Sequence, residues 1–452
     1  MAHPSEFKAV QDIDISKSNG FEIIITLFKK TNMEPTSSER VTTKPHPDRM
    51  PSPESGNESD KTQIAEGVVL QQLDTRSLPV FLVPFSPFRL NIVFESIDFR
   101  QPFGRIAAAL IFSIQFSEKW DCALRIITSK EPINKQYFLD ILAINNISLR
   151  RNIEFLTINP DISGLELPVG KSDFFLTTSW ITTARLQNAL GDDKIIYFLQ
   201  EDESKSGLVA DDYLHCLEVM KSKRLRYIVS TRILYEHLVS SGLENIRENG
   251  IWFEPAWPDS LFFPDPERSD GKKNFLFTNS GNSEGLCKLG LETINKAIQE
   301  RIFNLDEWNF GCIINTTQKN QDLPSFLLAC YQDPDWDEYS SLIQKTDLGF
   351  SLTSSSFLLP DYHPLDLAAC GAVVATNFLK NKETYHVYSK NVLYCQANVH
   401  EINQCLARGV DLVHKKDLRL RNFRNNGILK DWHKSFQEVL VSTEKWGFHV
   451  PT

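Results

Sequence analysis

The pattern of hydrophobic and polar positions divides the chain into an N-terminal stretch and two series of alternating strands and helices. From Asn32 to Thr62 the chain is mostly Pro, Ser, Thr, Glu and Lys, with almost no large apolar side chain. Such a segment buries too little apolar surface to offset the entropy lost on ordering. We therefore expect residues 1–66 to form a largely disordered tail with one apolar stretch, Phe21 to Phe28.

Short apolar runs bounded by polar or turn residues begin at about Leu78 and predict strands separated by helices. In the first series the predicted strands are 89–94, 123–128, 153–157, 173–177, 194–199, 227–230 and 251–254, with a helix over 135–147. In the second series the predicted strands are 274–278, 308–314, 348–353 and 372–376, with a helix over 290–300. Strands that alternate with helices are typical of parallel sheets in α/β proteins.

A polar, proline-rich stretch from Phe263 to Lys273 separates the two series, and we place an inter-domain linker there. The expected domains are residues 78–262 and 272–430, each a doubly wound, Rossmann-like α/β domain. Open sheets of this kind bind ligands outside the carboxyl ends of their strands, so a cleft between the two domains is the expected site.

The last segment of the chain is amphipathic. Residues 428–443 carry Trp432, Phe436, Val439 and Leu440 on one helical face. We expect a helix in the segment 431–452 that packs back across the base of the cleft.

Composition excludes several classes of protein. The chain has 452 residues, of which 41% are hydrophobic and 23% charged, and its net charge is −10. These proportions are ordinary for a soluble globular protein, and the negative charge argues against a nucleic-acid partner. No apolar run approaches the ~20 residues that span a bilayer. The N-terminus lacks the pattern of a secretory signal, which favours a cytoplasmic location.

The eight cysteines include no C-x-x-C pair, and the ten histidines show no H-E-x-x-H spacing. We interpret the cysteines as small buried hydrophobic residues in a reducing compartment. No metal site is expected.

Three constellations could carry chemistry. The first is Phe103-Gly104-Arg105, a single glycine where a predicted strand turns into a helix. Glycine lets the backbone approach a ligand, and a helix N-terminus favours an anion. The chain has neither G-x-G-x-x-G nor G-x-x-x-x-G-K-[ST], which disfavours dinucleotide and P-loop sites.

The second constellation is Gln200-Glu201-Asp202-Glu203, directly after a predicted strand. Its carboxylates could accept hydrogen bonds from sugar hydroxyls or act as a general base. A solvated acidic loop and a metal site in the D-x-D style are the alternatives. The D-x-D in Asp333 to Glu338 follows a predicted helical segment, and we interpret it as a turn.

The third constellation runs from Asp361 to Gly371 and precedes a buried strand. Pro364 suits the first position of a helix, and Asp366 falls in the first turn, where a carboxylate can accept ligand hydroxyls. The alternative is an ordinary helix start with an exposed first-turn carboxylate.

This third motif resembles the P-L-E-x-A-A-x-G-x-x-V-x-x-N segment of GT-B glycosyltransferases, and most of all the WsaF-type bacterial rhamnosyltransferases, which are similar to family 4. Other segments resemble that family in the same order along the chain, from about residue 78 to 440. These segments are 89–93 with Phe103-Gly104, 173–180 ending in Thr-Ser-Trp, 197–203, and 251–255.

The resemblance implies a GT-B fold and a metal-independent, retaining transfer without a cofactor. The donor would be a nucleoside-diphosphate sugar, dTDP-L-rhamnose in the family, and the acceptor a growing or lipid-linked glycan. Helix N-termini and basic side chains would hold the diphosphate. The implied setting is the cytoplasmic side of the inner membrane, with at most peripheral contact, beside other glycan-assembly enzymes.

The resemblance and the constellations together assign roles to particular residues. The expected catalytic residues are Glu201, Asp202 and Glu203. The expected nucleotide-sugar residues are Asp361, Tyr362, His363, Pro364, Asp366, Thr278, Ser280 and Lys288. The expected residues of the acceptor side and cleft loop are Phe103, Gly104, Arg105, Trp180 and Gln200.

The sequence also departs from the family pattern. Arg105 stands where the family has its second glycine, Leu358 where retaining family-4 enzymes carry a glutamate, and the usual second glutamate is Asp366. The segment 278–285 lacks the family's arginine, for which Lys288 is the candidate substitute. A catalytically silent GT-B subunit that acts in binding or scaffolding therefore stays open as an alternative. A different two-domain α/β protein, such as a sugar-nucleotide epimerase, is a further one.

Overall fold

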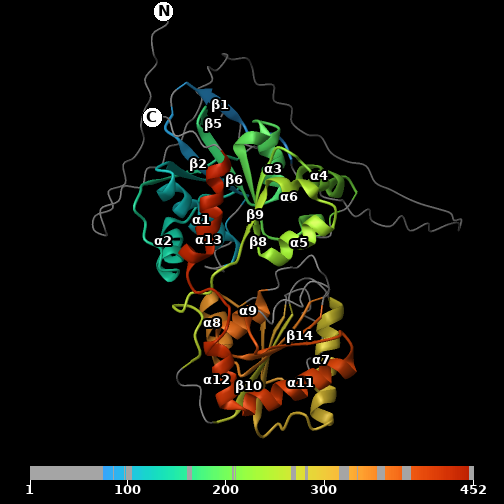
Figure 1. The fold of residues 1–452 in the computed structure, drawn as a ribbon. Helices are drawn as coiled ribbons and strands as arrows, with labels where there is room; N and C mark the ends of the chain where they lie inside the picture. Colours follow the sequence, from blue (N-terminus) through green and yellow to red (C-terminus); the bar gives the residue numbers. More distant parts are fainter. Residues whose placement is uncertain are drawn as a thin grey trace, which may run out of the picture.

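The structure is a computed structural model. It describes residues 75–84, 86–95, 97, 104–159, 165–205, 208, 210–265, 271–279, 284–314, 325–332, 334–353, 362–378 and 388–446. The expected N-terminal tail lies outside these residues. The described chain forms two α/β domains, each with a parallel sheet flanked by helices (Figure 1).

The sheet of the first domain has the strand order β4-β3-β2-β6-β7-β8-β9 in the described part of the chain. Its strands are β2 (Arg89–Phe94), β3 (Ala123–Thr128), β4 (Ile153–Thr157), β6 (Asp173–Thr177), β7 (Ile195–Leu199), β8 (Arg226–Ser230) and β9 (Gly250–Phe253). All neighbours pair in parallel. The strand order reverses between β2 and β6, the position at which doubly wound sheets open a binding crevice.

Helices connect these strands and cover both faces of the sheet. They are α1 (Arg105–Lys119), α2 (Lys135–Ile144), α3 (Trp180–Gln187), α4 (Asp211–Met220), α5 (Arg232–Ser240) and α6 (Glu244–Asn249), with short 3-10 turns η1 (Asp192–Lys194) and η2 (Glu203–Lys205). A separate parallel pair, β1 (Val80–Val83) with β5 (Leu167–Gly170), lies beside the main sheet. This pair could not be predicted from the sequence, because four-residue strands are too short to show alternation.

The sheet of the second domain has the strand order β12-β11-β10-β13-β14-β15 among the described residues. Its strands are β10 (Lys273–Asn279), β11 (Trp308–Ile314), β12 (Ala329–Gln332), β13 (Leu348–Leu352), β14 (Val373–Asn377) and β15 (Val392–Cys395). Its helices are α7 (Glu284–Gln299), α8 (Trp336–Lys345), α9 (His363–Ala369), α11 (Val399–His414) and α12 (Lys416–Arg424). Here the order reverses between β10 and β13.

The turn interpretation of Asp333 to Glu338 is wrong. The segment follows strand β12 rather than a helix, and Asp335 is the N-cap of α8, where its side chain accepts a hydrogen bond from the backbone N–H of Glu338 at 2.9 Å. A carboxylate that caps a helix N-terminus stabilises it through that bond and the helix dipole. Asp333 itself lies outside the described residues.

Alternate side chains along each central strand enter different cores. On β10, Phe275 and Phe277 pack on the side of α7 and α11, whereas Leu276 packs on the side of α9. This division follows from the two-residue period of a strand, and it explains why strands buried on both faces appear in the sequence as continuous apolar runs.

The chain returns to the first domain at its end. Helix α13 (Trp432–Ser442) lies beside α1 (Figure 1), and Trp432, Phe436 and Val439 belong to the core of the first domain. The ring of Phe436 lies 5.3 Å from that of Phe112 on α1 and 4.8 Å from that of Phe253 on β9. The turn η6 (Thr443–Trp446) follows. The chain therefore crosses from the second domain back to the first between α12 and α13, and the packing of α13 adds a second connection between the two domains.

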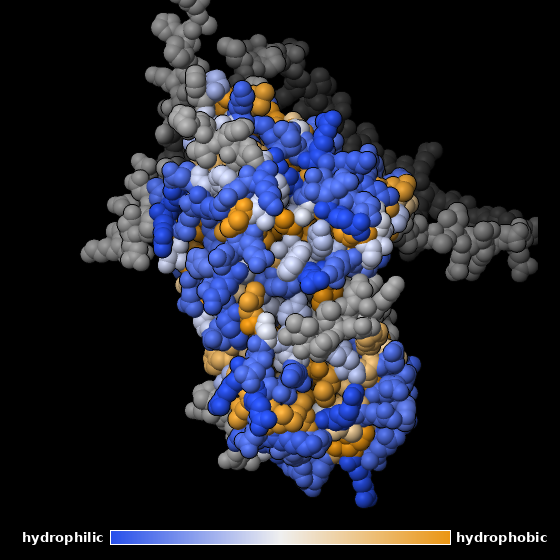
Figure 2. All heavy atoms as spheres, in the orientation of Figure 1, coloured by the Kyte–Doolittle hydropathy of each residue, from blue (hydrophilic) through white to orange (hydrophobic). Residues whose placement is uncertain are grey.

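The surface shown in Figure 2 is mostly hydrophilic, with apolar side chains scattered over both domains. Within the described ranges, no helix combines the length and the apolar character needed to cross a bilayer.

Candidate functional site: the crevice between the two sheets

The carboxyl ends of both sheets face one another across the domain boundary. Ser230 ends β8 of the first domain and Tyr362 directly precedes α9 of the second, and their hydroxyl oxygens lie 2.8 Å apart. A second bridge joins Tyr388, whose hydroxyl donates to a carboxylate oxygen of Glu254 at 2.6 Å. Polar groups of both domains therefore meet where the sequence predicts the crevice.

Burial raises the pKa of Tyr362 to about 12, although the Ser230 hydroxyl and the Arg105 cation act in the opposite direction. Its phenol therefore stays protonated and can donate a hydrogen bond at neutral pH. Burial also raises the pKa of Glu254, against the lowering effect of the Tyr388 hydroxyl.

We expect Tyr362→Phe to lower the free energy of unfolding by about 1 kcal/mol, because it removes a largely buried hydrogen bond. A urea titration measures this loss. Ser230→Ala should add little to the loss in the double variant, since the bond is already gone. Tyr213→Phe, which changes a tyrosine that is 40% exposed on α4, is the matched control. Additive losses in the double variant would contradict a direct bond between Ser230 and Tyr362.

Helix α1 begins at the crevice. Its N-cap is Gly104, with a φ of 85° that other residues rarely adopt. Gly104 thus lies directly before helix α1, where the sequence predicts the turn into a helix. The preceding Phe103 lies outside the described residues.

The acidic loop after β7 contacts this first turn of α1. Gln200 donates from Nε2 to the backbone oxygen of Arg105 at 2.9 Å, and the Arg105 guanidinium pairs with Glu201 at 2.5 Å. Burial lowers the pKa of Arg105, but Glu201, Tyr362 and Glu203 together raise it by more, so the pKa is raised overall and the cation is maintained. Two motifs that are about 95 residues apart in sequence therefore form one cluster at the crevice.

Glu201 is the most exposed of the three carboxylates in this loop. Its side chain is 21% exposed, whereas the residues Asp202 and Glu203 are only 2% and 7% exposed. A carboxylate that is reachable and paired with one cation can still accept hydrogen bonds from a ligand through its remaining lone pairs.

Asp202 is bound within the protein instead. Its oxygens interact with His237 Nε2 at 3.1 Å, the Ser204 hydroxyl at 2.5 Å and the Lys205 ammonium at 3.3 Å. Burial raises the pKa of Asp202, but these hydrogen bonds outweigh it and the pKa is lowered. Asp202 thus holds the loop against α5. The role of His237 could not be predicted, because nothing in a single sequence pairs it with a carboxylate 35 residues away.

Glu203 accepts a hydrogen bond from the backbone N–H of Trp180 at 2.8 Å, at the start of α3. Burial raises the pKa of Glu203 to about 7, and the neighbouring Glu201 raises it further, while the Trp180 N–H lowers it. The side chain of Trp180 is buried in the core, so its backbone rather than its indole contacts the acidic loop. The expected role of Trp180 in the acceptor-side cleft loop stays a prediction.

The donor-side expectations are only partly described. Thr278 and Ser351 are register partners near the carboxyl ends of β10 and β13, and both hydroxyls are buried without a hydrogen-bond partner. Lys288 is exposed on α7. Ser280 and Asp361 lie outside the described residues. The helix start is as expected apart from a shift of one residue, because α9 begins at His363 and Pro364 is its second residue.

Asp366 differs from the expectation of an exposed carboxylate. It is 3% exposed, and its two oxygens accept hydrogen bonds from the indole N–H of Trp257 at 2.7 Å and from the hydroxyl of Tyr339 at 2.8 Å. A first-turn position was therefore no guide to exposure, because Trp257, from the segment that follows β9, packs against this face of α9.

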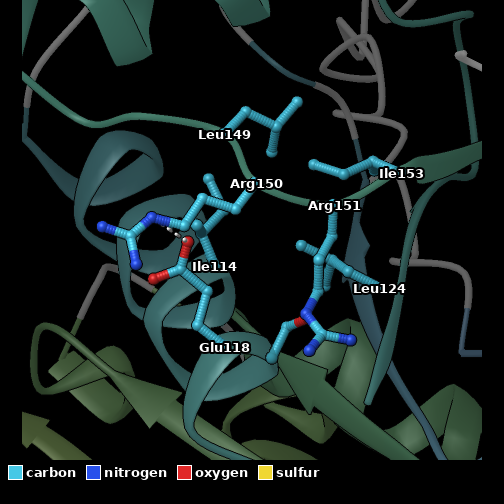
Figure 3. A pocket seen from close by; sticks show the side chains of 8 residues that line it. Ile114, Glu118, Leu124, Leu149, Arg150, Arg151 and Ile153 are labelled. Carbon is cyan, nitrogen blue, oxygen red and sulfur yellow. Dashed lines mark ion pairs between the residues drawn. The ribbon is translucent and has the colours of Figure 1, made fainter. Parts of the chain in front are cut away.

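A separate pocket lies away from the crevice, near the other end of α1 (Figure 3). Its lining residues are Ile114, Ser117, Glu118, Leu124, Leu149, Arg150, Arg151 and Ile153. Helix α1 has 15 residues, so its two ends are about 20 Å apart. Glu118 faces the Arg150 guanidinium at 4.0 Å, a weak surface pair. This pocket is not part of the candidate site.

In the portion of the chain that the structure describes, no group of three His, Cys, Asp or Glu side chains is arranged to hold a metal ion. The metal independence implied by the family resemblance stays a prediction.

Known proteins resemble this chain in sequence. Residues 89–210 match the family model "WsaF, N-terminal domain", and residues 275–407 match "WsaF, C-terminal domain". A curated relative, the O-antigen biosynthesis protein RfbC of Myxococcus xanthus, is 28% identical over 235 residues. That match covers 49% of this chain and 17% of the relative, so the chain spans only a fraction of the relative's length.

Solved structures resemble it in fold. The structure of Alr3699/HepE from Anabaena, in complex with UDP and glucose, matches with a TM-score of 0.53 at 10% identity, over 78% of this chain and 99% of the other. An α,α-trehalose-phosphate synthase (UDP-forming) from Burkholderia xenovorans, in complex with glucose-6-phosphate, matches with a TM-score of 0.51 at 8% identity, over 78% and 99%. These likenesses confirm the predicted GT-B fold.

The two family models together match more than half of the chain, one on each of the two sheets. They also agree in order with the motifs that first suggested the resemblance. The chain therefore belongs to the WsaF family of GT-B glycosyltransferases.

Proposed function

We propose that this protein transfers a sugar, rhamnose or a similar hexose, from a nucleoside-diphosphate donor to a growing surface glycan. The transfer is metal-independent and retains the anomeric configuration. Family membership and the GT-B fold support the proposal, as does the O-antigen biosynthesis role named for the curated relative. The observation that carries it is the meeting of Arg105 and Glu201 with Tyr362 at the facing ends of the two sheets.

In this proposal the donor lies on the second domain, against the start of α9 and the carboxyl ends of β10 and β13. Tyr362 and His363 border the crevice at the start of α9, and Thr278 and Lys288 belong to the adjoining elements. Glu201 accepts hydrogen bonds from sugar hydroxyls, and its ion pair with the Arg105 guanidinium holds it in place. Asp202 and Glu203 position this loop rather than contact the sugar, because both are nearly buried and bound within the protein.

The acceptor is a glycan or a lipid-linked glycan that approaches from the side of the first domain. The protein works at the cytoplasmic face of the membrane, with at most peripheral contact with it. Other glycan-assembly enzymes supply its acceptor or extend its product.

A second candidate function is a silent GT-B subunit that binds glycan or nucleotide without transfer. One observation favours it: Asp202, Glu203 and Asp366 all commit their carboxylate oxygens to groups of the protein. Of the three carboxylates in the loop after β7, Glu201 is the one that is partly exposed, which leaves this loop few groups to act on the reacting sugar.

Turnover separates the two functions. The full-length chain is mixed with dTDP-L-rhamnose, UDP-glucose or GDP-mannose and short oligosaccharides, and phosphorus NMR follows release of the nucleoside diphosphate. If the protein is a transferase, we expect release from one donor, at a rate that is at least tenfold slower in Glu201→Gln. The control is Glu438→Gln, which changes an exposed carboxylate on α13. Binding of a donor without release would favour the silent subunit.

A further inference from the structure

Two thiols meet at the edge of the second domain's sheet, apart from the cluster of Arg105 and Glu201. Cys312 on β11 and Cys330 on β12 are register partners, and the thiol of Cys312 donates to the sulfur of Cys330 at 2.9 Å. Both are free thiols in the structure. We propose that Cys312 and Cys330 form a reversible redox modification site, which closes to a disulfide on reaction with a peroxide.

The backbone geometry suits such a bond. Neighbouring strands lie about 4.8 Å apart, and disulfides join residues whose Cα atoms are about 4.4–6.8 Å apart. Strand β12 has four residues and stands at the edge of the sheet, paired with β11 alone among the described strands. A short edge strand can shift slightly to bring two sulfurs to bonding distance, whereas a central strand held on both sides cannot.

The two thiols differ in exposure and acidity. Cys312 is fully buried, and Cys330 is partly exposed. The hydrogen bond from Cys312 lowers the pKa of Cys330, against the effect of burial, and the same bond together with burial raises the pKa of Cys312. The thiolate is the nucleophilic form of cysteine, so Cys330 is the residue that reacts first.

The chemistry balances in two steps. The Cys330 thiolate attacks one oxygen of hydrogen peroxide, the O–O bond breaks, and a sulfenic acid and a hydroxide ion form. The Cys312 sulfur then attacks the Cys330 sulfur, the S–O bond breaks, and water leaves with the Cys312 proton. The two sulfurs lose two electrons in total, and the peroxide becomes two waters once hydroxide takes up the proton that Cys330 had released. The disulfide closes the chain between the two residues, 313–329, into a covalent ring.

Other thiols of the chain could also react with peroxide. Cys287 on α7 is buried in the same core, and Cys395 and Cys405 form another close pair in the second domain. All eight cysteines fall within the described ranges, and of these Cys330 is the one that is not buried. A reaction that begins at solvent should therefore select the pair that contains Cys330.

The test uses the full-length chain. It is treated with a few equivalents of hydrogen peroxide, quenched in acid, unfolded, alkylated and digested with trypsin. Cleavage after Arg301, Lys319 and Lys345 leaves Cys312 in peptide 302–319 and Cys330 in peptide 320–345. We expect these two peptides to be recovered as one species, lighter by two hydrogens than their sum. Dithiothreitol given before the quench should abolish it.

Three variants assign the order of events. Cys312→Ser should leave a sulfenic acid at Cys330 that dimedone traps, whereas Cys330→Ser should leave Cys312 unreacted. Cys122→Ser, which removes a buried thiol of the first domain, should behave as the wild type. Alkylation of all eight cysteines after oxidation, a disulfide between other residues, or dimedone labelling of Cys312 in Cys330→Ser would each overturn the proposal. The peptide map of the wild type decides it even if a variant fails to fold.

Discussion

Asp366→Asn should lower the free energy of unfolding by about 3 kcal/mol, because the asparagine can accept through only one of the two atoms that now bind Trp257 and Tyr339. Hydrogen bonds to a charged group are worth about 1.5–3 kcal/mol each, and a buried donor left without a partner adds its desolvation cost. The effect is large for a substitution that conserves size and shape.

A urea titration of the variant measures the loss, and Asp337→Asn is the matched control, since Asp337 is an exposed first-turn carboxylate on the adjacent helix α8. Calorimetry with the donor nucleotide measures the donor affinity of the same variant. If Asp366 also binds the ribose, as the family resemblance implies, donor affinity falls roughly 10- to 150-fold as well. If the stability of Asp366→Asn is within about 0.5 kcal/mol of the wild type, the two hydrogen bonds of Asp366 to Trp257 and Tyr339 do not stabilise the fold as we expect.

Glu203→Gln should remove a pH dependence of stability that amounts to about 3 kcal/mol. The pKa of Glu203 is raised from 4.5 to about 7 in the folded protein, mainly by burial, so the folded state favours the protonated carboxyl. The stabilisation is fully present below the unfolded pKa of about 4.5 and is lost as the pH rises through about 7. A pKa that differs by one between the unfolded and folded states corresponds to about 1.4 kcal/mol of stability, which gives the stated size.

Urea midpoints at about pH 5 and pH 8 test this expectation. The wild type should lose about 2.5 kcal/mol relative to Glu203→Gln between these values, because glutamine mimics the protonated acid and does not titrate. Glu438→Gln, at an exposed position on α13, should leave the wild-type slope unchanged. Parallel slopes in the wild type and Glu203→Gln would show that the buried carboxyl does not titrate near neutral pH.

Much of the fold follows from the apolar runs of the central strands. The strands at 89–94 and 123–128 have the predicted bounds, since each is a nearly fully buried run that is followed by a polar residue. The edge strands β12 and β15 were missed, because partial burial gives them mixed composition over four residues. The strand order was not predicted, since no local pattern in the sequence encodes which strands pair.

The candidate site was predictable only in part. The meeting of Gly104-Arg105 with Gln200-Glu201 follows from parallel strands whose carboxyl ends share one edge of a sheet. The burial of Asp366 was not predictable, because its partner Trp257 lies 109 residues away in the chain. The burial of Asp202 and Glu203 depends in the same way on distant residues.

In the proposed function, the crevice between the two sheets binds a nucleoside-diphosphate sugar. A thermal-shift screen of the full-length chain against dTDP, UDP, GDP and their sugars tests it most directly. One nucleotide family should stabilise the folded state by about 2.7 kcal/mol at 100 times its dissociation constant. The stabilisation by its sugar should fall in Glu201→Gln, where the carboxylate at the crevice loses its charge, and persist in Glu438→Gln. No stabilisation by any of these nucleotides or their sugars would contradict the account.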